Sequence, residues 1–470
     1  MSRFVTSLLT LCVVFGTSVS VEIVTMDSFL DTLRSNHPVF TKEDLSVEIE
    51  KKAKESLLGA EDWMLSAGLT VFRENPEIAI GGPERTDAFS LSAGVNRAFW
   101  RTGGRFSASI STGAGEMKLD PSYGFPESFH QHRVAVSYTH PLLKNRGGIL
   151  DRLSYDLKEF DIDVAAIRSR ENKEIFLAGV AGDFITLVFL LEQEHIIGER
   201  LSLSLDELDR TKRKREANLV DQVDVIRAED AVTIARETLV LVKSRRKAVQ
   251  AQLAILAQWD DMNELNPSFD LYEQPMLPPL DAELERLSGA SRLLQSIRVR
   301  KEQLHVVLDA YEHTRLPDLY LTVEANTKNF DDDFGTSLEM DKYDLLLGLA
   351  FNVPLEKREA NGLVEKTRLE LKQLEYAERE IILDINSSLT NLHVQISELD
   401  SVLVLNREQI ASAQKRTEEE LKLYNQGRGS LTFVLQSRDS EQAARLLYAQ
   451  NAASLQTLLI QYKSLLDEIL

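Results

Sequence analysis

Two stretches of the sequence have the pattern of very long α-helices. No proline lies between Pro141 and Pro267, and neither proline nor glycine occurs from Leu363 to Gln426. In the second stretch the apolar residues alternate steps of four and three, which is the seam of a coiled coil. The seam consists of Ile385, Leu389, Leu392, Ile396, Leu399 and Leu403. At a rise of about 1.5 Å per residue such a helix exceeds the core of a compact domain, so we predict long coiled-coil helices.

Residues 425–430 interrupt the second helical pattern. Gly427 and Gly429 are typical of a helix C-terminus, and Ser430 is placed to cap the helix that follows. Apolar periodicity then resumes at Leu431 and continues to Leu470. The pattern therefore predicts an antiparallel helical hairpin with both glycines at its tip.

The first half of the chain carries the same design. A shift of 209 positions superimposes Val225-Ile226 on Val434-Leu435 and Asp230 on Asp439. Two further matches, at shifts of 213 and 252 positions, occur in the same order along the chain. An internal duplication accounts for all three matches. It predicts a first helical tip near residues 217–219, where the sequence has no glycine.

Shorter segments alternate apolar and polar residues, as β-strands do. Leu319, Leu321, Val323 and Ala325 would share one face of a sheet. The same alternation occurs in residues 345–353, 69–71 and 134–138. It is typical of membrane-barrel strands, although a half-buried sheet in a soluble domain gives the same pattern. An additional hairpin is expected within residues 87–112. In a membrane barrel it would extend at or beyond the outer face rather than join the barrel wall.

These patterns divide the chain into two repeats of a strand pair followed by long antiparallel helices. The fold class predicted is mainly α with a small β part. The first repeat is placed at residues 21–258, with strands at about 65–140 and long helices at about 142–258. A proline-rich connector at 259–292 leads to the second repeat at 293–470, with strands at about 317–353 and long helices at about 356–470. Short helical segments, at about 26–64 and 281–314, precede the strands of each half.

The first 20 residues have the composition of a secretory signal peptide, with Arg3, a short apolar stretch and small residues at 18–20. The only cysteine, Cys12, lies in this segment, so the mature chain would contain no thiol. Leu11 before it is a poor match to a lipidation signal, which leaves lipidation undecided. No later segment has 18 consecutive apolar residues, so membrane insertion would require a β-barrel.

Composition and charge exclude several function classes. An apolar fraction of 43% with 27% charged residues is ordinary for a folded protein. The net charge of -20 makes nucleic acid an unsuitable partner, because phosphates are bound by clusters of Lys and Arg. The sequence contains no nucleophile motif and no phosphate-binding loop, and no catalytic, cofactor or metal residues are predicted. We therefore expect a protein that is not an enzyme.

Several segments resemble the TolC-like outer-membrane efflux and secretion channels of Gram-negative bacteria. They are Asn36-His37-Pro38, Leu316-Pro317-Asp318-Leu319, the strand-to-helix junctions at 137–143 and 350–355, and the tip Tyr424-Asn425-Gln426-Gly427. The resemblance implies a homotrimer with a helical tunnel in the periplasm and a transmembrane β-barrel cap. It also implies a periplasmic adaptor, an inner-membrane transporter and outer-membrane lipid as partners. A barrel needs about eight strands or more, so four predicted strands independently favour an oligomer.

Two sets of charged residues near the tips are candidate functional residues. Asp221 and Asp224, just past the first tip, could form acidic rings that gate the periplasmic end of such a channel. Asp230 and Asp439 are further gate candidates, at matched positions two turns farther on. The basic run Lys212, Arg213, Lys214 and Arg215, together with Arg428, could contact an adaptor. Solvated helical surfaces, and the interaction of basic residues with a helix C-terminus, explain both sets without any function.

The sequence thus predicts a passive exit duct of a tripartite efflux pump or a type I secretion system. The alternative is a periplasmic adaptor or a coiled-coil structural protein of the cell envelope. The exported substrate, whether a drug, a metal or a protein, is not indicated by any motif.

Overall fold

The computed structural model describes residues 23–75, 83–118, 127–259, 265–274 and 276–470. The predicted signal peptide and Cys12 lie outside the described residues. The chain divides into two compact units. Unit 1 takes Met1–Thr41, Asn172–Glu285 and Asn386–Leu470, and unit 2 takes Lys42–Glu171 and Arg286–Ile385. Each unit therefore combines segments from both halves of the sequence.

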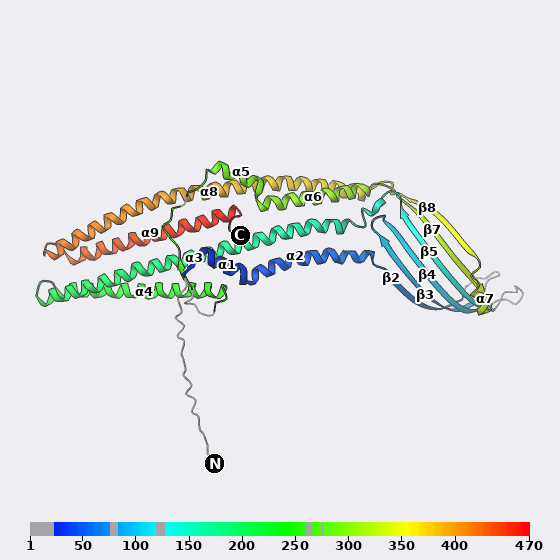
Figure 1. Ribbon diagram of the computed structural model, residues 1–470, viewed down its shortest axis with the longest axis horizontal. Coiled ribbons are helices and arrows are strands. Elements are labelled where there is room, and N and C mark those ends of the chain that lie inside the picture. The colour runs from blue at the N-terminus through cyan, green and yellow to red at the C-terminus, as the bar shows by residue number, and fades with distance from the viewer. Residues whose placement is uncertain (1–22, 76–82, 119–126, 260–264, 275) are drawn as a thin grey trace, which may run out of the picture. The chain divides into compact units, whose positions relative to one another are not determined.

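The long helices predicted from periodicity are present (Figure 1). Helix α3 (Leu153–Glu216) has 64 residues and α8 (Arg358–Asn425) has 68, and each is followed by a return helix. The return helices α4 (Gln222–Leu256) and α9 (Leu431–Leu465) both have 35 residues, and their starts are 209 positions apart. Ile385, which is 4% exposed, begins the predicted coiled-coil seam, and the seam stays largely buried as far as Leu403, at 1%.

The shorter helices differ in detail from the expectation. The segment expected at 26–64 divides into α1 (Met26–Asn36), α2 (Pro38–Leu57) and η1 (Leu58–Glu61), because His37 before a proline takes an extended conformation. The segment expected at 281–314 divides into α5 (Leu280–Ala290) and α6 (Arg292–His313). The first long helix begins at Leu153 rather than near 142, after a loop that contains η3 (Arg146–Gly148). A two-stranded parallel pairing of β1 (Ile23–Thr25) with β6 (Asn266–Ser268) has no signal in the pattern.

Within the described residues, six strands of unit 2 form one antiparallel sheet, in the order β2-β3-β4-β5-β7-β8. The strands are β2 (Met64–Glu74), β3 (Arg85–Phe99), β4 (Gly104–Lys118), β5 (Ser128–Pro141), β7 (Asp318–Asp331) and β8 (Tyr343–Asn352). The hairpin β3–β4 was expected to extend beyond the other strands, but it is part of their sheet. It stands between β2 and β5, because its backbone groups pair with both. A four-residue helix, α7 (Phe334–Ser337), follows β7.

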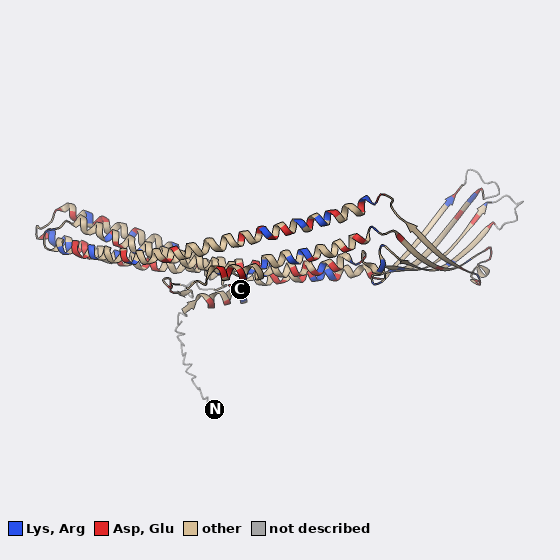
Figure 2. Ribbon diagram, turned by 90° about the horizontal axis from the view of Figure 1, so that it is seen from above, with Lys and Arg blue, Asp and Glu red and all other residues tan. Residues whose placement is uncertain are grey.

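Unit 1 has an apolar core, and the helices of unit 2 combine buried apolar residues such as Leu294 and Val364 with ion pairs between helices. In unit 1, Phe29 of α1 packs on Phe184 of α3 at 5.5 Å between ring centroids. In unit 2, Lys158 of α3 contacts Glu50 of α2 at 2.6 Å. Figure 2 shows charged residues of both signs along the helices. Ion pairs therefore supplement apolar contacts between the helices of unit 2.

One helical region of the described chain is long and apolar enough to cross a membrane by length and composition alone. It lies within Arg146–Glu216, where a window reaches a mean hydropathy of 2.0 and is half buried. A core helix of a soluble protein meets the same criterion. The region contains α3, whose Phe184 and Leu187 belong to the buried core of unit 1.

Candidate channel wall and helix tips

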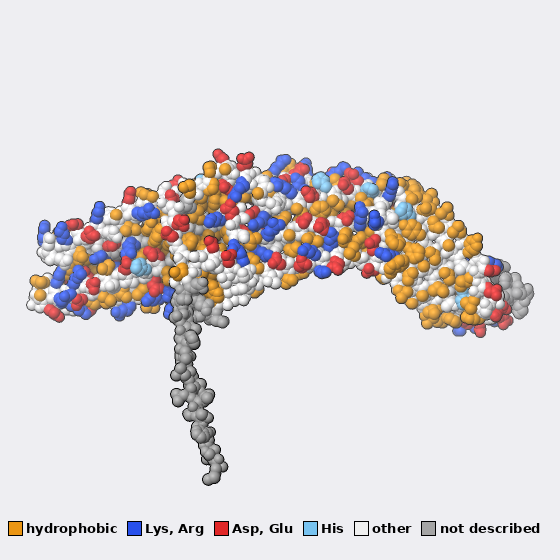
Figure 3. All heavy atoms as spheres, in the orientation of Figure 1, with side chains coloured by type: hydrophobic (Ala, Val, Ile, Leu, Met, Phe, Trp, Pro, Cys, Tyr) orange, Lys and Arg blue, Asp and Glu red, His pale blue; other side chains and the backbone are white. Residues whose placement is uncertain are grey.

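The six-stranded sheet has one face that is almost entirely apolar, which we call the apolar face. Cross-strand partners lie on the same side of a sheet, so the register assigns alternate residues to it. They are alternate residues of Leu65–Val71, Phe89–Val95, Phe106–Ala114, Val134–Tyr138, Leu319–Ala325 and Leu345–Phe351. Leu69, Val71 and Leu347 on this face are 68%, 74% and 74% exposed. Figure 3 shows hydrophobic side chains gathered over these strands.

The opposite side, which we call the polar face, consists largely of small polar residues and glycine. It includes alternate residues of Ser66–Thr70, Ser90–Asn96, Ser107–Gly113, Arg133–Thr139, Thr322–Lys328 and Asp344–Ala350. Charges on this face are paired across strands, as Arg133 and Glu324 are at 3.0 Å. Lys328 and Asp344 lie 3.6 Å apart. The sheet therefore has one apolar face and one polar face.

Polar contacts mark the end of the apolar face that lies toward the β2–β3 and β7–β8 connections. Asp87 of β3 forms ion pairs there with both Arg73 and Arg85. On β5, the buried His132 is 3.1 Å from the Ser337 hydroxyl of α7. The described residues contain no group of His, Cys, Asp and Glu that could hold a metal ion. His132 is thus part of a polar rim around the apolar face.

Both outer strands of the sheet, β2 and β8, lack a partner on their outer side among the described residues. An unpaired edge presents a row of backbone donors and acceptors that can pair with another chain. The 11-residue β2 and the 10-residue β8 carry large exposed apolar side chains, such as Leu65 at 76% and Leu345 at 72%. A sheet with this arrangement is incomplete as a water-soluble monomer.

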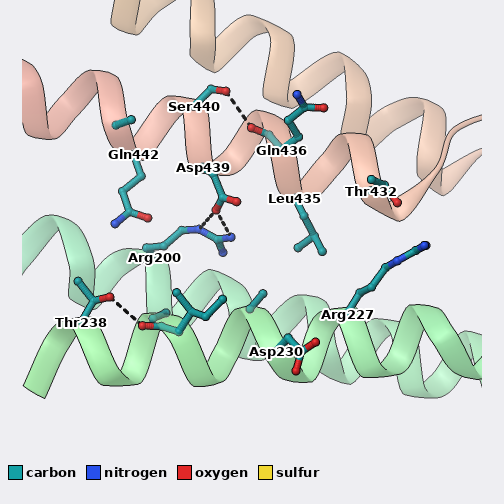
Figure 4. A pocket seen from close by; sticks show the side chains of 14 residues that line it. Arg200, Arg227, Asp230, Thr238, Thr432, Leu435, Gln436, Asp439, Ser440 and Gln442 are labelled. Atoms are coloured by element: carbon teal, nitrogen blue, oxygen red, sulfur yellow. Dashed lines mark hydrogen bonds and ion pairs between the residues drawn. The ribbon is translucent and has the colours of Figure 1, made fainter.

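In unit 1, the predicted positions Asp230 and Asp439 line the same open cavity of about 680 Å³, between α4 and α9. Arg200 of α3 is 7% exposed and donates to Asp439, with 2.7 Å between Nη2 and Oδ1. Figure 4 shows the Arg200 guanidinium directed at Asp439, while Asp230 lies on the facing helix. Arg200 also contacts the hydroxyl of Ser204. The buried arginine therefore ties two helices of different halves of the chain together.

No family model matches the sequence. No curated protein matches it either. The solved structures that align with 94% of the chain include the Vibrio cholerae outer membrane protein VceC, the Campylobacter jejuni outer membrane channel CmeC and the Neisseria gonorrhoeae outer membrane channel MtrE. The alignments have TM-scores of 0.67, 0.67 and 0.62 and identities of 9%, 13% and 13%, and they cover 96%, 85% and 88% of those chains.

The chain has the fold of the TolC-like outer-membrane channels. The resemblance noted in the sequence is thereby confirmed at the level of the fold.

In this TolC-like fold, the first helical tip lies where the duplication predicts it. Helix α3 ends at Glu216 and α4 begins at Gln222, and Asn218 has a φ of 54°. Asparagine is among the few residues other than glycine that adopt this left-handed conformation readily. Asp221 occupies the N-cap position of α4, and Asp224 lies 3.2 Å from Arg227 one turn along the same helix.

The second tip uses its two glycines differently. Gly427 has a φ of 74°, which closes the turn after α8. At Gly429 the two backbone segments lie so close that a Cβ atom would be 2.9 Å from the Tyr424 backbone nitrogen. A larger residue at this position would therefore force the backbone to shift. The Ser430 hydroxyl accepts a hydrogen bond from the Thr432 amide, which confirms the predicted cap. Between the hairpins, a buried apolar cluster of Ala228, Tyr424, Leu431 and Val434 holds the tips together.

The basic run is not a uniform exposed patch. Lys212 pairs with Glu229 at 3.1 Å, and Arg213 pairs with Asp209 one turn back on α3. Lys214 lies over the Tyr424 ring at 3.4 Å from its centroid, and burial lowers the pKa of its amine. Arg215 and Arg428 are exposed. Lys214 therefore packs within the tip, whereas Arg215 and Arg428 face solvent.

Sequence reasoning missed Glu207, which is 7% exposed on α3. Burial raises the pKa of its carboxyl, and the nearby cations Arg210 and Lys214 oppose this only in part. Its position on a helix with many carboxylates gives no signal, because burial here depends on the contacts of α3 with other helices. Glu207 is a titratable group inside the region where gating was expected.

Proposed function

We propose that three copies of this chain form a channel in the outer membrane, with its helices in the periplasm. The observation that carries the proposal is the exposed apolar face of the six-stranded sheet, backed by a polar face. A transmembrane barrel alternates lipid-facing and lumen-facing residues in this way. A strand crosses a bilayer in about 9–11 residues, and the shortest of the six, β8, has 10.

The unpaired edges of β2 and β8 would allow several copies of the sheet to close into a barrel. Neighbouring strands run antiparallel throughout the sheet, and their number is even. The β8 edge of one copy can therefore meet the β2 edge of the next in antiparallel orientation, and head-to-tail contacts of this kind generate closed rings. Closure removes both edges and places every apolar face outward. The number of three copies rests on the TolC-like resemblance.

The solved structures with this fold support the membrane assignment. CmeC, OprN and MtrE are described as outer-membrane channels, and CusC in terms of transmembrane channel formation. By analogy, the chain would serve as the passive exit duct of a tripartite efflux pump or a type I secretion system. An inner-membrane transporter would supply the energy, and a periplasmic adaptor would join the two. The two-repeat division at 21–258 and 293–470 is part of this proposal.

For the gate, the contacts suggest different roles for the four acidic candidates. We assign Asp221 and Asp224, near the first tip, to rings that attract cations. Asp439 is held by Arg200, so its role would be to keep α9 against α3 in the closed state, with Asp230 across the cavity. Arg200→Ala should raise the resting single-channel conductance in planar bilayers, whereas Gln442→Ala, on the same cavity, should not. Neutralising Asp221 and Asp224 should lower cation selectivity.

For the adaptor contact, we propose Arg215 and Arg428 as the principal residues, with Lys212 and Arg213 beside them and Lys214 excluded. Reversing the charge of Arg215 and Arg428 should abolish crosslinking to the adaptor while leaving the amount of assembled protein unchanged. Intact crosslinking and export in this double variant would rule the contact out.

Cell fractionation tests the proposal as a whole. Heat-modifiable trimers in outer-membrane fractions are expected. Recovery of the chain as a soluble periplasmic protein would instead support the alternative, a periplasmic adaptor or coiled-coil structural protein.

A further inference from the structure

The hairpin β3–β4 is an integral part of the sheet. Residues 64–74 of β2 pair with β3, and residues 105–116 of β4 pair with β5, without a break in either register. Removing the hairpin would leave β2 and β5, which run in opposite directions, free to pair with each other. The hairpin is therefore an in-register insertion of two strands into a wall that could close without it.

The turn of this hairpin is anchored rather than free. The Trp100 amide donates to the Glu61 carboxylate at 2.7 Å, and the Trp100 ring packs on Tyr155 at 5.5 Å between centroids. Gly148, at a φ of 67°, approaches the Trp100 carbonyl so closely that a Cβ atom would lie 1.7 Å from the oxygen. These contacts fix the turn to the segments that precede β2 and lead into α3, so the hairpin cannot hang as a flap.

Both faces of the hairpin continue the faces of the whole sheet. On the apolar face, Leu91 and Ile110 are 50% and 54% exposed. On the polar face, a Cβ atom on Gly115 would lie 2.6 Å from the Ala88 Cβ, and one on Gly113 would lie 2.9 Å from the Phe89 carbonyl oxygen. Each strand has 15 residues, enough to cross a bilayer in a tilted barrel. An extension in water would have no need of an apolar side.

We propose that β3 and β4 belong to the transmembrane wall, so that a ring of three copies encloses an eighteen-stranded barrel instead of a twelve-stranded one. This inference rests on the proposed function. Barrel diameter grows roughly linearly with strand number, so the bore would be about 1.5 times wider. The inserted strands line it with serine and glycine, which occupy little of the added space. The outer end of the duct would therefore admit solutes of larger cross-section.

Single-cysteine spin labelling tests the placement in the full-length chain, with Cys12→Ser as background. Leu91→Cys and Ile110→Cys report on the apolar face of the hairpin, and Ser92→Cys and Ser109→Cys on its polar face. Leu347→Cys in β8 and Thr322→Cys in β7 are the matched controls on either face of the remaining wall. Each variant is purified into lipid nanodiscs, and the accessibility of the label to oxygen is compared with its accessibility to a water-soluble nickel chelate.

The proposal predicts that Leu91 and Ile110 labels favour oxygen and that Ser92 and Ser109 labels favour nickel, with the same contrast as the control pair. If all four hairpin labels favour nickel while the control pair alternates, the hairpin lies outside the wall and this inference is wrong, although the channel stands. If the control pair does not alternate, the proposed channel itself is wrong.

The wider bore is tested separately by deletion of residues 85–118. Polymers that enter the outer mouth lower the conductance of the channel. The largest polymer radius that still enters should be smaller by about one third in this variant. An unchanged cut-off in a correctly assembled deletion variant would contradict the eighteen-stranded wall. If the variant does not assemble, the labelling of the full-length chain decides.

Discussion

The sheet and the helix tips distribute apolar residues in opposite ways. In the sheet, Leu69 and Leu347 are 68% and 74% exposed. At the tips, Leu431 and Val434 are 1% and 0% exposed and lie inside a cluster whose surroundings are charged. The tips thus follow the pattern of a protein in water, with apolar residues inside.

This difference is what the proposed channel requires, in which one chain meets both lipid and water. Large contiguous apolar surfaces are rare on soluble monomers and mark contact with lipid or another protein. In the proposed channel, lipid and neighbouring copies would cover the sheet, whereas the tips contain their own apolar cluster. Changes that add charge should therefore have opposite consequences in the two regions.

The largest effect is expected from a charge on the apolar face. Leu347→Lys should cost about 2–4 kcal/mol in the membrane-inserted state, because the ammonium group would face the bilayer near the middle of β8. The measurement is the yield of heat-modifiable oligomer in outer-membrane fractions. Its neighbour Leu346 lies on the polar face, so Leu346→Lys should assemble normally. Equal yields from the two variants would contradict the assignment of the faces.

A smaller effect is expected in the loop between β5 and α3, which holds the turn of the β3–β4 hairpin in place. Gly147 and Gly148 both have positive φ angles, 70° and 67°, so alanine at either costs roughly 1 kcal/mol in backbone strain. Only the Cβ atom of Gly148→Ala would also collide with the Trp100 carbonyl, since Gly147 has open space around it. Gly148→Ala should therefore cost roughly 2 kcal/mol more than Gly147→Ala. Thermal denaturation of the purified protein in lipid checks the difference, and equal melting temperatures would argue against the tight approach.

At the tips, a buried carboxylate provides the next test. Because burial raises the pKa of Glu207, protonated Glu207 contributes stability below the ordinary pKa of 4.5, and this contribution is lost as the pH rises through the raised value. Glu207→Gln should stabilise the protein by about 1 kcal/mol at neutral pH and remove this pH dependence. Melting temperatures from pH 4 to pH 8 measure both effects. The exposed neighbour is the control: Asp206→Asn should leave the pH profile unchanged, and a parallel shift in both variants would assign the effect to net charge.

The smallest effects are expected where the two tips differ. Gly427→Ala should cost about 1 kcal/mol, because alanine disfavours a φ of 74°. Asn218→Gly should change stability by only a few tenths of a kcal/mol, since asparagine already tolerates the left-handed conformation. Urea titrations monitored by helical circular dichroism compare the two variants. A larger loss from Asn218→Gly than from Gly427→Ala would show that the Asn218 side chain has a role beyond its backbone conformation.

The elements that repeat along the chain could be predicted from the sequence. The coiled-coil seam from Ile385 to Leu403 and the alternation in β7 are local patterns, and the structure confirms both. The tip at Gly427 carries its own turn chemistry. The tip at Asn218 was found only by comparison of the two halves.

Spatial neighbours could not be predicted in the same way. Alternation showed that β3 and β4 are strands, but the pairing partners of a strand do not appear in its own sequence. The same limit applies to Lys214 and Glu207, whose burial depends on residues far away in the chain such as Tyr424. Three-residue strands such as β1 are too short to show a period.

The most direct test of the account is the structure of the assembled particle by electron cryo-microscopy in lipid nanodiscs. The account predicts a closed ring in which β8 of each copy pairs antiparallel with β2 of the next and the apolar face contacts lipid. A particle whose β2 and β8 edges remain unpaired, or whose apolar face is buried against protein, would contradict it.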